Sequence, residues 1–224
     1  KKRLEKLLHQ NEKLASMGRV LSGIANKIKT PLSTIQTSAQ YLVKRFQSEK
    51  NLESRFAQNI YDESKRLGQT VDNFLHYAEP KQPRMESVDL RELSREVLEF
   101  LEPETRNKRI KVENNLQDVD IQGDRELLYR ALYNILLNAC QAVDVEGKIN
   151  LQWSDEKREL TIIDSGPGFE ADPRKCTEPF YTTRDYGVGL GLAIAENIFK
   201  NLGGELVLEN AKQSTGAVVR IIFH

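Results

Sequence analysis

The sequence has no excess charge, few cysteines and no long apolar run, and each absence excludes a class of protein. Acidic and basic residues number 33 each, so no net field favours nucleic acid or an anionic membrane surface. No apolar run approaches the ~20 residues that span a bilayer, and no signal peptide is visible. The cysteines, Cys140 and Cys176, lack metal-ligand spacing. Cys140 lies in an apolar helical pattern, which indicates packing and fits a reducing compartment.

The residue pattern changes near residue 80, and a chain of 224 residues suits two small domains. Residues 1–79 have helical periodicity, residues 80–84 form a short linker, and residues 85–224 alternate helix and strand patterns. We therefore predict an α+β fold: an N-terminal two-helix hairpin followed by an α/β sandwich, with helices on one face of a mixed sheet.

The N-terminal domain begins with an apolar seam whose members are alternately three and four residues apart. The seam comprises Leu4, Leu7, Asn11, Leu14, Gly18, Leu21, Ala25, Ile28, Leu32, Ile35, Ala39, Leu42 and Phe46. Such a heptad pattern predicts a long helix that pairs with another, bent at Pro31 and turning near 48–51. A second helix, with Phe56, Ile60 and Leu67 near one face, ends close to residue 79. One hairpin cannot cover both apolar faces, so we expect a homodimeric four-helix bundle through residues 1–79.

The second domain is predicted from alternating periodicities of two and of 3.6 residues. We expect strands at 85–90, 110–114, 119–122, 149–154, 160–164, 205–209 and 217–223, and helices at 90–107, 124–143 and 189–202. Asp124 has the character of a helix N-cap, and two glycines at 203 and 204 end the last helix.

The predicted strand at 160–164 ends at Asp164 and is followed by a turn that contains Gly166 and Gly168. A carboxylate beside backbone without Cβ atoms suits recognition of a planar ligand that carries an exocyclic amine. Taken alone, the pattern is also that of an ordinary turn.

Asn134 and Asn138 share one stripe of the predicted helix at 124–143, separate from its apolar side. An amide oxygen can complete a Mg²⁺ shell otherwise filled by water and phosphate oxygens. The alternative is that both asparagines only solvate the helix. Further along, Gly187, Gly189 and Gly191 open a helix, and a glycine-rich helix N-terminus suits an anion.

Together these blocks resemble the ATP-binding domain of sensor histidine kinases and their gyrase, Hsp90 and MutL relatives. The matching residues are Asn134 and Asn138, Asp164, Gly166 and Gly168, Phe180 with residues 181–183, and Gly187, Gly189 and Gly191. The resemblance implies ATP and Mg²⁺ as cofactors, with Asn138 as the metal ligand. It implies a short lid at 173–186, where Thr182, Thr183 and Arg184 could reach phosphate. Leu190 is included in the nucleotide site, whereas Phe180 and Tyr181 are expected mainly to pack the base of the lid.

The segment 22–32 resembles the phospho-acceptor motif of the same family, but it carries Asn26 where the family has histidine and Lys27 where it has an acidic residue. An amide nitrogen has a delocalised lone pair and is no nucleophile, whereas imidazole is nucleophilic near neutral pH. Thr30 lies one helical turn later, where the family places a residue that orients attacking water.

Three hypotheses follow from the resemblance. The first is a histidine kinase core that binds Mg-ATP and signals to a response-regulator receiver domain, with self-phosphorylation impaired at Asn26. The second is an ATP-gated scaffold without enzymatic activity, and the third is a phosphatase for a phosphorylated receiver domain. A rapid ATPase of the gyrase type is disfavoured because Asn134 stands where that class places a general base. We expect a cytoplasmic location, with any membrane part before residue 1, and no nucleic-acid partner.

Overall fold

The computed structural model describes residue 28 and the ranges 32–45, 52–78, 82–170, 172–183, 189–211 and 215–224, with the backbone alone at 69 and 73–78. The chain divides into two compact units, Lys1–Pro80 and Lys81–His224. This division falls inside the stretch predicted as a linker. None of the helices in the described part of the chain is both long and apolar enough to cross a membrane.

The first unit contains a helical hairpin, as predicted. Residues 32–45 are helical and precede α2 (Leu52–Ala78). Leu32 and Ala39 are buried, and a Cβ added to Gly68 of α2 would lie 3.7 Å from the Leu32 Cδ2 atom. The two helices therefore pack through small side chains. The predicted bend at 31 and turn at 48–51 lie outside the described residues.

The predicted seam divides into two stripes in this structure. Leu32 and Ala39 are buried within the hairpin, whereas the alternate seam members Ile28, Ile35 and Leu42 are 46%, 49% and 38% exposed. On α2 the exposed apolar residues include Leu52, Phe56, Ile60 and Leu67. A single hairpin thus leaves apolar heptad positions of both helices uncovered.

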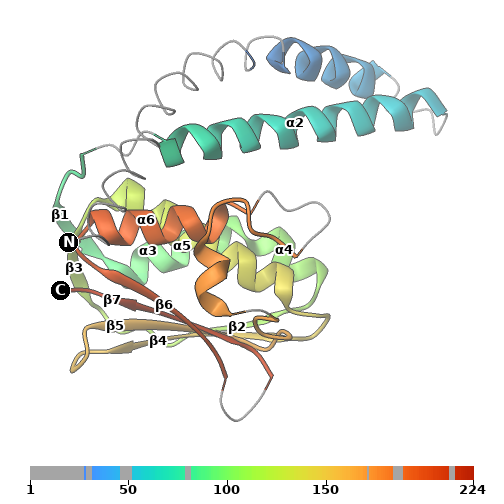
Figure 1. Cartoon of the computed structure of the whole chain (residues 1–224). Helices are drawn as coiled ribbons and strands as arrows, with labels where there is room; N and C mark the ends of the chain where they lie inside the picture. Colours follow the sequence, from blue (N-terminus) through green and yellow to red (C-terminus); the bar gives the residue numbers. More distant parts are fainter. Residues whose placement is uncertain are drawn as a thin grey trace. The chain divides into compact units, whose positions relative to one another are not determined.

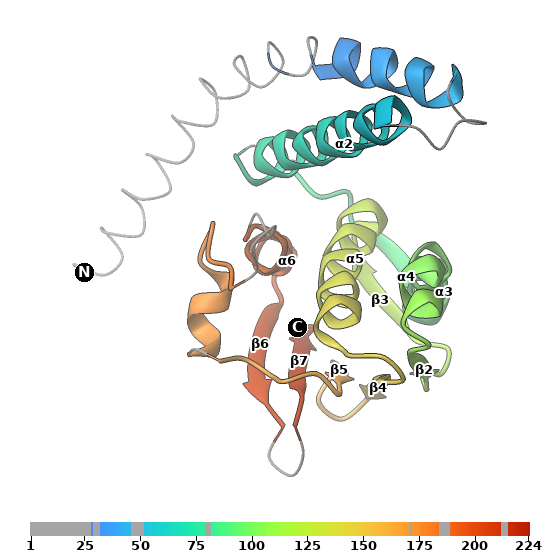
Figure 2. The same ribbon diagram turned by 90° about the vertical axis from the view of Figure 1, so that its right-hand side faces the viewer.

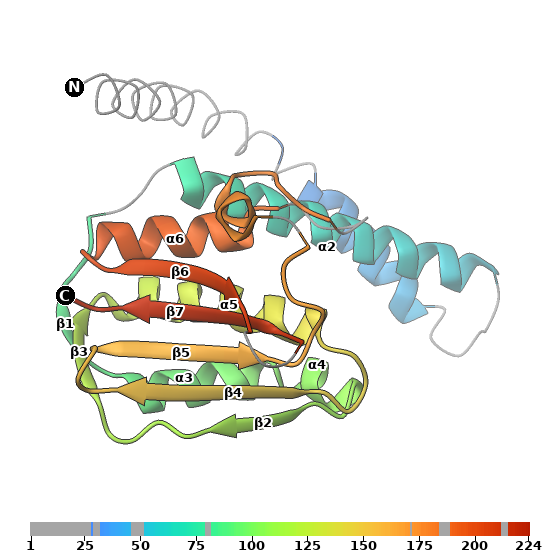
Figure 3. The same ribbon diagram turned by 60° about the horizontal axis from the view of Figure 1, so that its bottom comes forward.

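The second unit is built on a five-stranded mixed sheet, as predicted (Figure 1). Its spatial order is β2 (Lys111–Asn114), β4 (Lys148–Ser154), β5 (Glu159–Asp164), β7 (Ala217–Ile222) and β6 (Glu205–Asn210). The pairing of β2 with β4 is parallel and the other pairings are antiparallel. Figure 3 shows the five strands side by side, and Figure 2 shows α3, α5 and α6 over one face of the sheet.

Two local features differ from the sequence prediction. Strands β1 (Glu86–Asp89) and β3 (Asp120–Gly123) form a separate two-stranded antiparallel sheet. The helix predicted at 90–107 is two helices, α3 (Leu90–Phe100) and α4 (Glu102–Asn107). The break occurs because Pro103 has no N–H to donate to the preceding turn, and proline is favoured only in the first turn of a new helix.

Helix α5 (Arg125–Ala142) is held at both ends by side chains. At its start, Asp124 accepts a hydrogen bond from the backbone N–H of Leu127 at 3.1 Å, which confirms the predicted N-cap. At its end, the ammonium of Lys108 donates to the carbonyl oxygens of Cys140, Gln141 and Val143 at 2.8–3.0 Å. A cation there also complements the helix dipole. The apolar side predicted for α5 is buried throughout.

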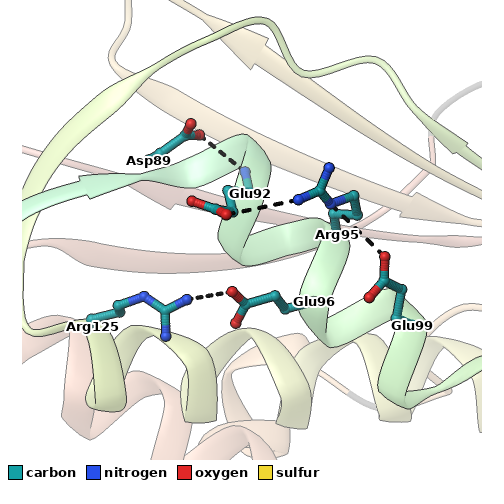
Figure 4. A network of polar contacts seen from close by, with 6 residues as sticks. All are labelled: Asp89, Glu92, Arg95, Glu96, Glu99 and Arg125. Carbon is teal, nitrogen blue, oxygen red and sulfur yellow. Dashed lines mark hydrogen bonds and ion pairs between the residues drawn. The ribbon is translucent and has the colours of Figure 1, made fainter.

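Polar contacts connect α3 to the start of α5 (Figure 4). Asp89 caps α3 by accepting a hydrogen bond from the backbone N–H of Glu92 at 3.0 Å. Glu96 of α3 pairs with Arg125, the first residue of α5. The side chains of Arg125 and Glu96 are 46% and 36% exposed, so we assign this ion pair a minor share of stability and an orienting role.

Helix α6 (Gly191–Asn201) starts two residues later than predicted. Gly189 has φ +68°, a left-handed conformation that cannot begin a right-handed helix, and Leu190 is the N-cap. The helix ends as predicted: Gly203 has φ +79°, and the N–H of Gly204 donates to the carbonyl of Phe199 at 2.7 Å. Between β5 and α6, a short 3₁₀ helix, η1 (Pro173–Thr177), occupies the start of the stretch expected to be a lid, residues 173–186.

Candidate nucleotide-binding site

Asp164 is a buried carboxylate at the end of β5, with only 6% of its surface exposed. Its Oδ1 atom accepts hydrogen bonds from the backbone N–H of Gly166 at 2.8 Å and of Ala217 at 3.3 Å. Buried charge is costly unless hydrogen-bonded, and donors from two segments meet that need. The carboxylate is therefore fixed in one orientation before any ligand arrives.

The turn after Asp164 is packed too closely for side chains. A Cβ on Gly166 would lie 2.9 Å from the carbonyl oxygen of Ala142 at the end of α5. Gly168 has φ +83°, and its Cβ would lie 2.7 Å from the side-chain oxygen of Asn210. Both glycines of the predicted motif are thus required by contact or by backbone conformation.

The asparagines of α5 meet the start of α6. A Cβ on Gly191 would lie 3.4 Å from Asn134 Oδ1 and 3.4 Å from Asn138 Nδ2. Asn134 is buried and donates through Nδ2 to the carbonyl of Arg130 at 3.0 Å, which directs its oxygen toward α6. Asn138 is half-buried. Two blocks that are more than 50 residues apart in sequence therefore adjoin.

The N-terminus of α6 has no side-chain cap and no acidic residue in its first turn. The first N–H groups of a helix have no partner within it, and the helix dipole favours an anion there. Leu190, predicted in the nucleotide site, is only 1% exposed, and its place in that site stays a prediction.

The base of the predicted lid is joined to the glycine block. The backbone N–H of Phe180 donates to the carbonyl of Gly189 at 2.8 Å. A Cβ on Gly189 would lie 2.5 Å from the carbonyl oxygen of Tyr181, so this close approach requires glycine. Phe180 has φ +67° and is 60% exposed, and its packing at the lid base stays a prediction. Tyr181 is half-buried.

Several predicted site residues are exposed or cannot be placed. Thr182 and Thr183 are exposed beside the lid base, where a ligand could reach them. Arg184 and Gly187 lie outside the described residues, as do Asn26, Lys27 and Thr30 of the acceptor segment.

Sequence reasoning missed Asn210, at the end of β6, which contacts the backbone of Phe169. It also missed Lys108, which caps α5, and the N–H of Ala217, which reaches Asp164. The partners in these contacts are between 32 and 53 residues apart. No local periodicity or motif connects positions so distant, so the sequence patterns gave no signal for these contacts.

The donor set fits a magnesium ion that is bound chiefly through phosphate and water. Among the residues that the structure describes, no three His, Cys, Asp or Glu side chains form a metal-binding cluster. Asn138 offers a neutral amide oxygen instead, which is a suitable single protein ligand for Mg²⁺. Cys140 is buried, and this burial raises the pKa of its thiol to about 11. This supports its predicted packing role.

Comparisons with known proteins agree with this geometry. The family described as "Histidine kinase-, DNA gyrase B-, and HSP90-like ATPase" matches residues 123–224, and the "His Kinase A (phospho-acceptor) domain" matches residues 16–83. The sensor histidine kinase ZraS of Escherichia coli (strain K12) is 30% identical over 95% of this chain and 47% of its own length. The signal transduction histidine-protein kinase AtoS of the same organism is 29% identical over 92% of this chain and 34% of its own length.

Solved structures extend the agreement to the fold. The catalytic domain of histidine kinase ThkA is 30% identical, with a TM-score of 0.56 over 62% of this chain and 95% of that domain. ThkA in complex with the response regulator protein TrrA is 25% identical, with a TM-score of 0.68 over 99% of this chain and 65% of the matched one.

The chain belongs to the sensor histidine kinase family and carries both the phospho-acceptor and the ATPase domain of a histidine kinase core. It spans between about a third and a half of the curated relatives named above. The family resemblance, the enzyme class and the fold class predicted from sequence are thereby confirmed.

Proposed function

We propose that this chain is a two-component kinase core that binds Mg²⁺-ATP and signals to a response-regulator receiver domain, with self-phosphorylation impaired at Asn26. The observation that carries the nucleotide site is the meeting of Gly191 with Asn134 and Asn138, at 3.4 Å from a Cβ on the glycine. It brings the side-chain amides of both asparagines to an uncapped helix N-terminus, and Asp164 lies at the end of the strand that contacts the same helix α5.

Each part of the site would meet a different part of the nucleotide. The fixed carboxylate of Asp164 suits the exocyclic amine of adenine. Asn138 would hold Mg²⁺, with Asn134 beside it, and the N–H groups at Gly189 and Gly191 would face phosphate oxygens. Thr182, Thr183 and Arg184 would approach the phosphates from the lid, and Phe180 and Gly187 would flank them. When bound, Mg²⁺-ATP supplies the phosphoryl group and the metal neutralises its charge.

The acceptor position determines whether a phosphoryl group can pass from bound nucleotide to the chain. Asn26 lacks a nucleophilic nitrogen, so it cannot take up a phosphoryl group. Lys27 replaces the carboxylate that would orient or deprotonate an imidazole. We therefore place Asn26, Lys27 and Thr30 at the position where the family carries out its chemistry, with phosphoryl transfer to the chain blocked.

The helical unit supports a homodimer and a docked receiver domain. Ile28, Ile35 and Leu42 recur every seven residues and stay exposed in the single hairpin, which is the arrangement a four-helix bundle covers. ThkA has been solved with its response regulator TrrA, which supports a receiver domain as partner here. We place this core in the cytoplasm, with any membrane part outside the chain.

Calorimetry with ATP and magnesium tests the nucleotide site. The chain is expected to bind Mg²⁺-ATP, and Asp164→Asn is expected to weaken binding at least about tenfold, because a buried contact to a charged group contributes about 1.5–3 kcal/mol. Asparagine keeps a side-chain oxygen for the N–H of Gly166, so the turn remains. No heat of association with the unaltered chain would refute the proposal.

Radiolabelled ATP tests the acceptor position. The chain as it stands is expected to take up no label, and the double variant Asn26→His, Lys27→Glu is expected to gain it. Strong labelling of the unaltered chain would contradict the role given to residue 26. If the double variant binds ATP but stays unlabelled, the scaffold hypothesis is favoured. Loss of phosphate from a phosphorylated receiver domain mixed with the unaltered chain would favour the phosphatase.

A further inference from the structure

The side chain of Asn210 forms a two-point contact with the backbone of Phe169. Its Oδ1 atom accepts a hydrogen bond from the Phe169 N–H at 2.7 Å, and its Nδ2 atom donates to the Phe169 carbonyl at 3.0 Å. A carboxamide presents a donor and an acceptor side by side, which is the pattern that the N–H and C=O of one residue require. Asn210 ends β6, and the two residues are 41 positions apart.

The end of the β6–β7 hairpin touches the Asp164 loop at a second place. The N–H of Ala217 donates to Asp164 Oδ1, and a Cβ on Gly216 would collide with the carbonyl oxygen of Asp164. The hairpin end itself is closed by a hydrogen bond from the N–H of Ala211 to the carbonyl of Gly216 at 3.0 Å. The start of β7 therefore contacts the carboxylate of Asp164, and the end of β6 contacts Phe169, which follows the glycine turn.

The turn between these two contacts has a backbone that depends on outside support. Gly168 sits at φ +83°, and glycine adopts positive and negative φ with similar ease, so its own preference does not select this conformation. Phe169 follows directly, and Asn210 holds both of its backbone polar groups. The position of Phe169 relative to Asp164 is thus set by a side chain from another strand.

We propose that Asn210 is a positioning residue for the nucleotide: it holds the loop 166–169 in the register that lets Asp164 meet adenine. This rests on the proposed function, because Asp164 is the adenine-recognising group there. Asn210 acts through the loop and need not touch the ligand. Because its side chain is exposed, water competes for these hydrogen bonds, and the effect on affinity is moderate.

The test compares nucleotide affinity in the full chain with variants at 210. Asn210→Ala removes both hydrogen bonds and is expected to weaken Mg²⁺-ATP binding about 3- to 10-fold, as lost exposed hydrogen bonds of ordinary strength would. Asn210→Asp keeps the acceptor for the Phe169 N–H and loses the donor to its carbonyl. It is expected to leave the Phe169 amide protected from hydrogen exchange, whereas Asn210→Ala exposes that amide.

The ratio of ATP to GTP affinity distinguishes a positioning role of Asn210 from a general effect on the stability of the fold. If Asn210 sets the geometry of Asp164, Asn210→Ala narrows the ratio of ATP to GTP affinity, which a general loosening of the fold would not do. Asn115, an exposed asparagine after β2 at the opposite edge of the sheet, offers matched controls. Asn115→Ala and Asn115→Asp are expected to change neither affinity nor selectivity.

The possible outcomes distinguish the positioning role of Asn210 from the proposed binding of Mg²⁺-ATP on which it rests. Normal ATP binding by the unaltered chain, with unchanged affinity and unchanged ATP-to-GTP ratio in Asn210→Ala, overturns the inference alone. An unaltered chain that binds no ATP overturns the proposed function and, with it, this role for Asn210. Weaker binding, a narrower ratio and faster exchange at Phe169 together support the inference.

Discussion

The carboxylate of Asp164 accepts a hydrogen bond from the backbone N–H of Gly166 at 2.8 Å, so the acidic residue of the site also shapes the turn after it. The same glycine packs against the carbonyl of Ala142 at the end of α5. The strand end, its turn and the helix that carries the asparagines are therefore one packed unit, and a change at Gly166 disturbs all three.

Gly166→Ala is expected to lower both stability and nucleotide affinity. Its new Cβ would lie 2.9 Å from Ala142 O and from Asp164 Oδ1, and relieving such overpacking costs typically about 1–3 kcal/mol. Urea denaturation measures this loss. Gly203→Ala is the control: Gly203 has φ +79° with nothing within 4 Å of an added Cβ, so only about 1–2 kcal/mol of left-handed strain is expected. Equal losses, with ATP affinity unchanged in Gly166→Ala, would contradict the packing argument.

Asp124 anchors the start of α5, and its removal is expected to destabilise the ATPase domain. The carboxylate accepts hydrogen bonds from the backbone N–H groups of Leu127 at 3.1 Å and Arg84 at 2.8 Å. Asp124→Ala is expected to cost about 0.5–2 kcal/mol in the free energy of unfolding at pH 7, the usual effect of losing an N-cap. Asp118→Ala, at an exposed aspartate paired with Arg91, is the control and is expected to cost less.

The stability difference at Asp124 is also expected to depend on pH. Burial alone raises the pKa of Asp124, but hydrogen bonds from the backbone N–H groups of Arg84, Leu127 and Glu126 outweigh it and lower the pKa below 3.8. A lowered folded-state pKa stabilises the fold above the unfolded value, and this contribution is lost as the pH falls through the folded value. The gap between the unaltered chain and Asp124→Ala should hold at higher pH and shrink below 3.8. A gap that widens in acid would contradict this assignment.

Lys108→Met is expected to loosen the end of α5. The variant keeps the apolar stem but removes the donor to the carbonyls of Cys140, Gln141 and Val143. Hydrogen bonds to charged groups contribute about 1.5–3 kcal/mol, and a loss in that range is expected from urea denaturation. Lys157→Met, at an exposed lysine in the β4–β5 turn, is the matched control and should change little.

The exposed apolar stripes are expected to form the dimer interface. Ile35 and Ile60 are 49% and 48% exposed in the single hairpin. Ile35→Glu with Ile60→Glu would bury charge in a bundle, so the double variant is expected to be monomeric by light scattering while circular dichroism retains its helix signal. Gln40→Glu, at an exposed position off the stripe, should leave the dimer intact. A double variant that stays dimeric would place the interface elsewhere.

Local signals predicted the elements of the ATPase domain well. Asp124 as N-cap, the apolar side of α5, the strands β4 and β5 and the glycine stop after α6 all follow from periodicity and capping within a few residues. The predictions failed where a longer-range or backbone effect competed with periodicity. The apolar pattern predicted one helix at 90–107, but Pro103 separates it into α3 and α4. The helix predicted from residue 189 begins at Gly191, because Gly189 has a left-handed backbone conformation.

By itself the sequence predicted which residues carry the chemistry, because Asp164, Asn138 and the glycine blocks are recognisable as short motifs. It also predicted that Asn26 stands in the place of the acceptor. Only the tertiary structure decided how these motifs are held: Asn210 on Phe169, Ala217 on Asp164 and Gly191 against Asn138. Strand order and helix packing bring these residues together. A hydrogen bond between distant segments does not change the hydrophobic periodicity of either segment, so the sequence pattern does not indicate it.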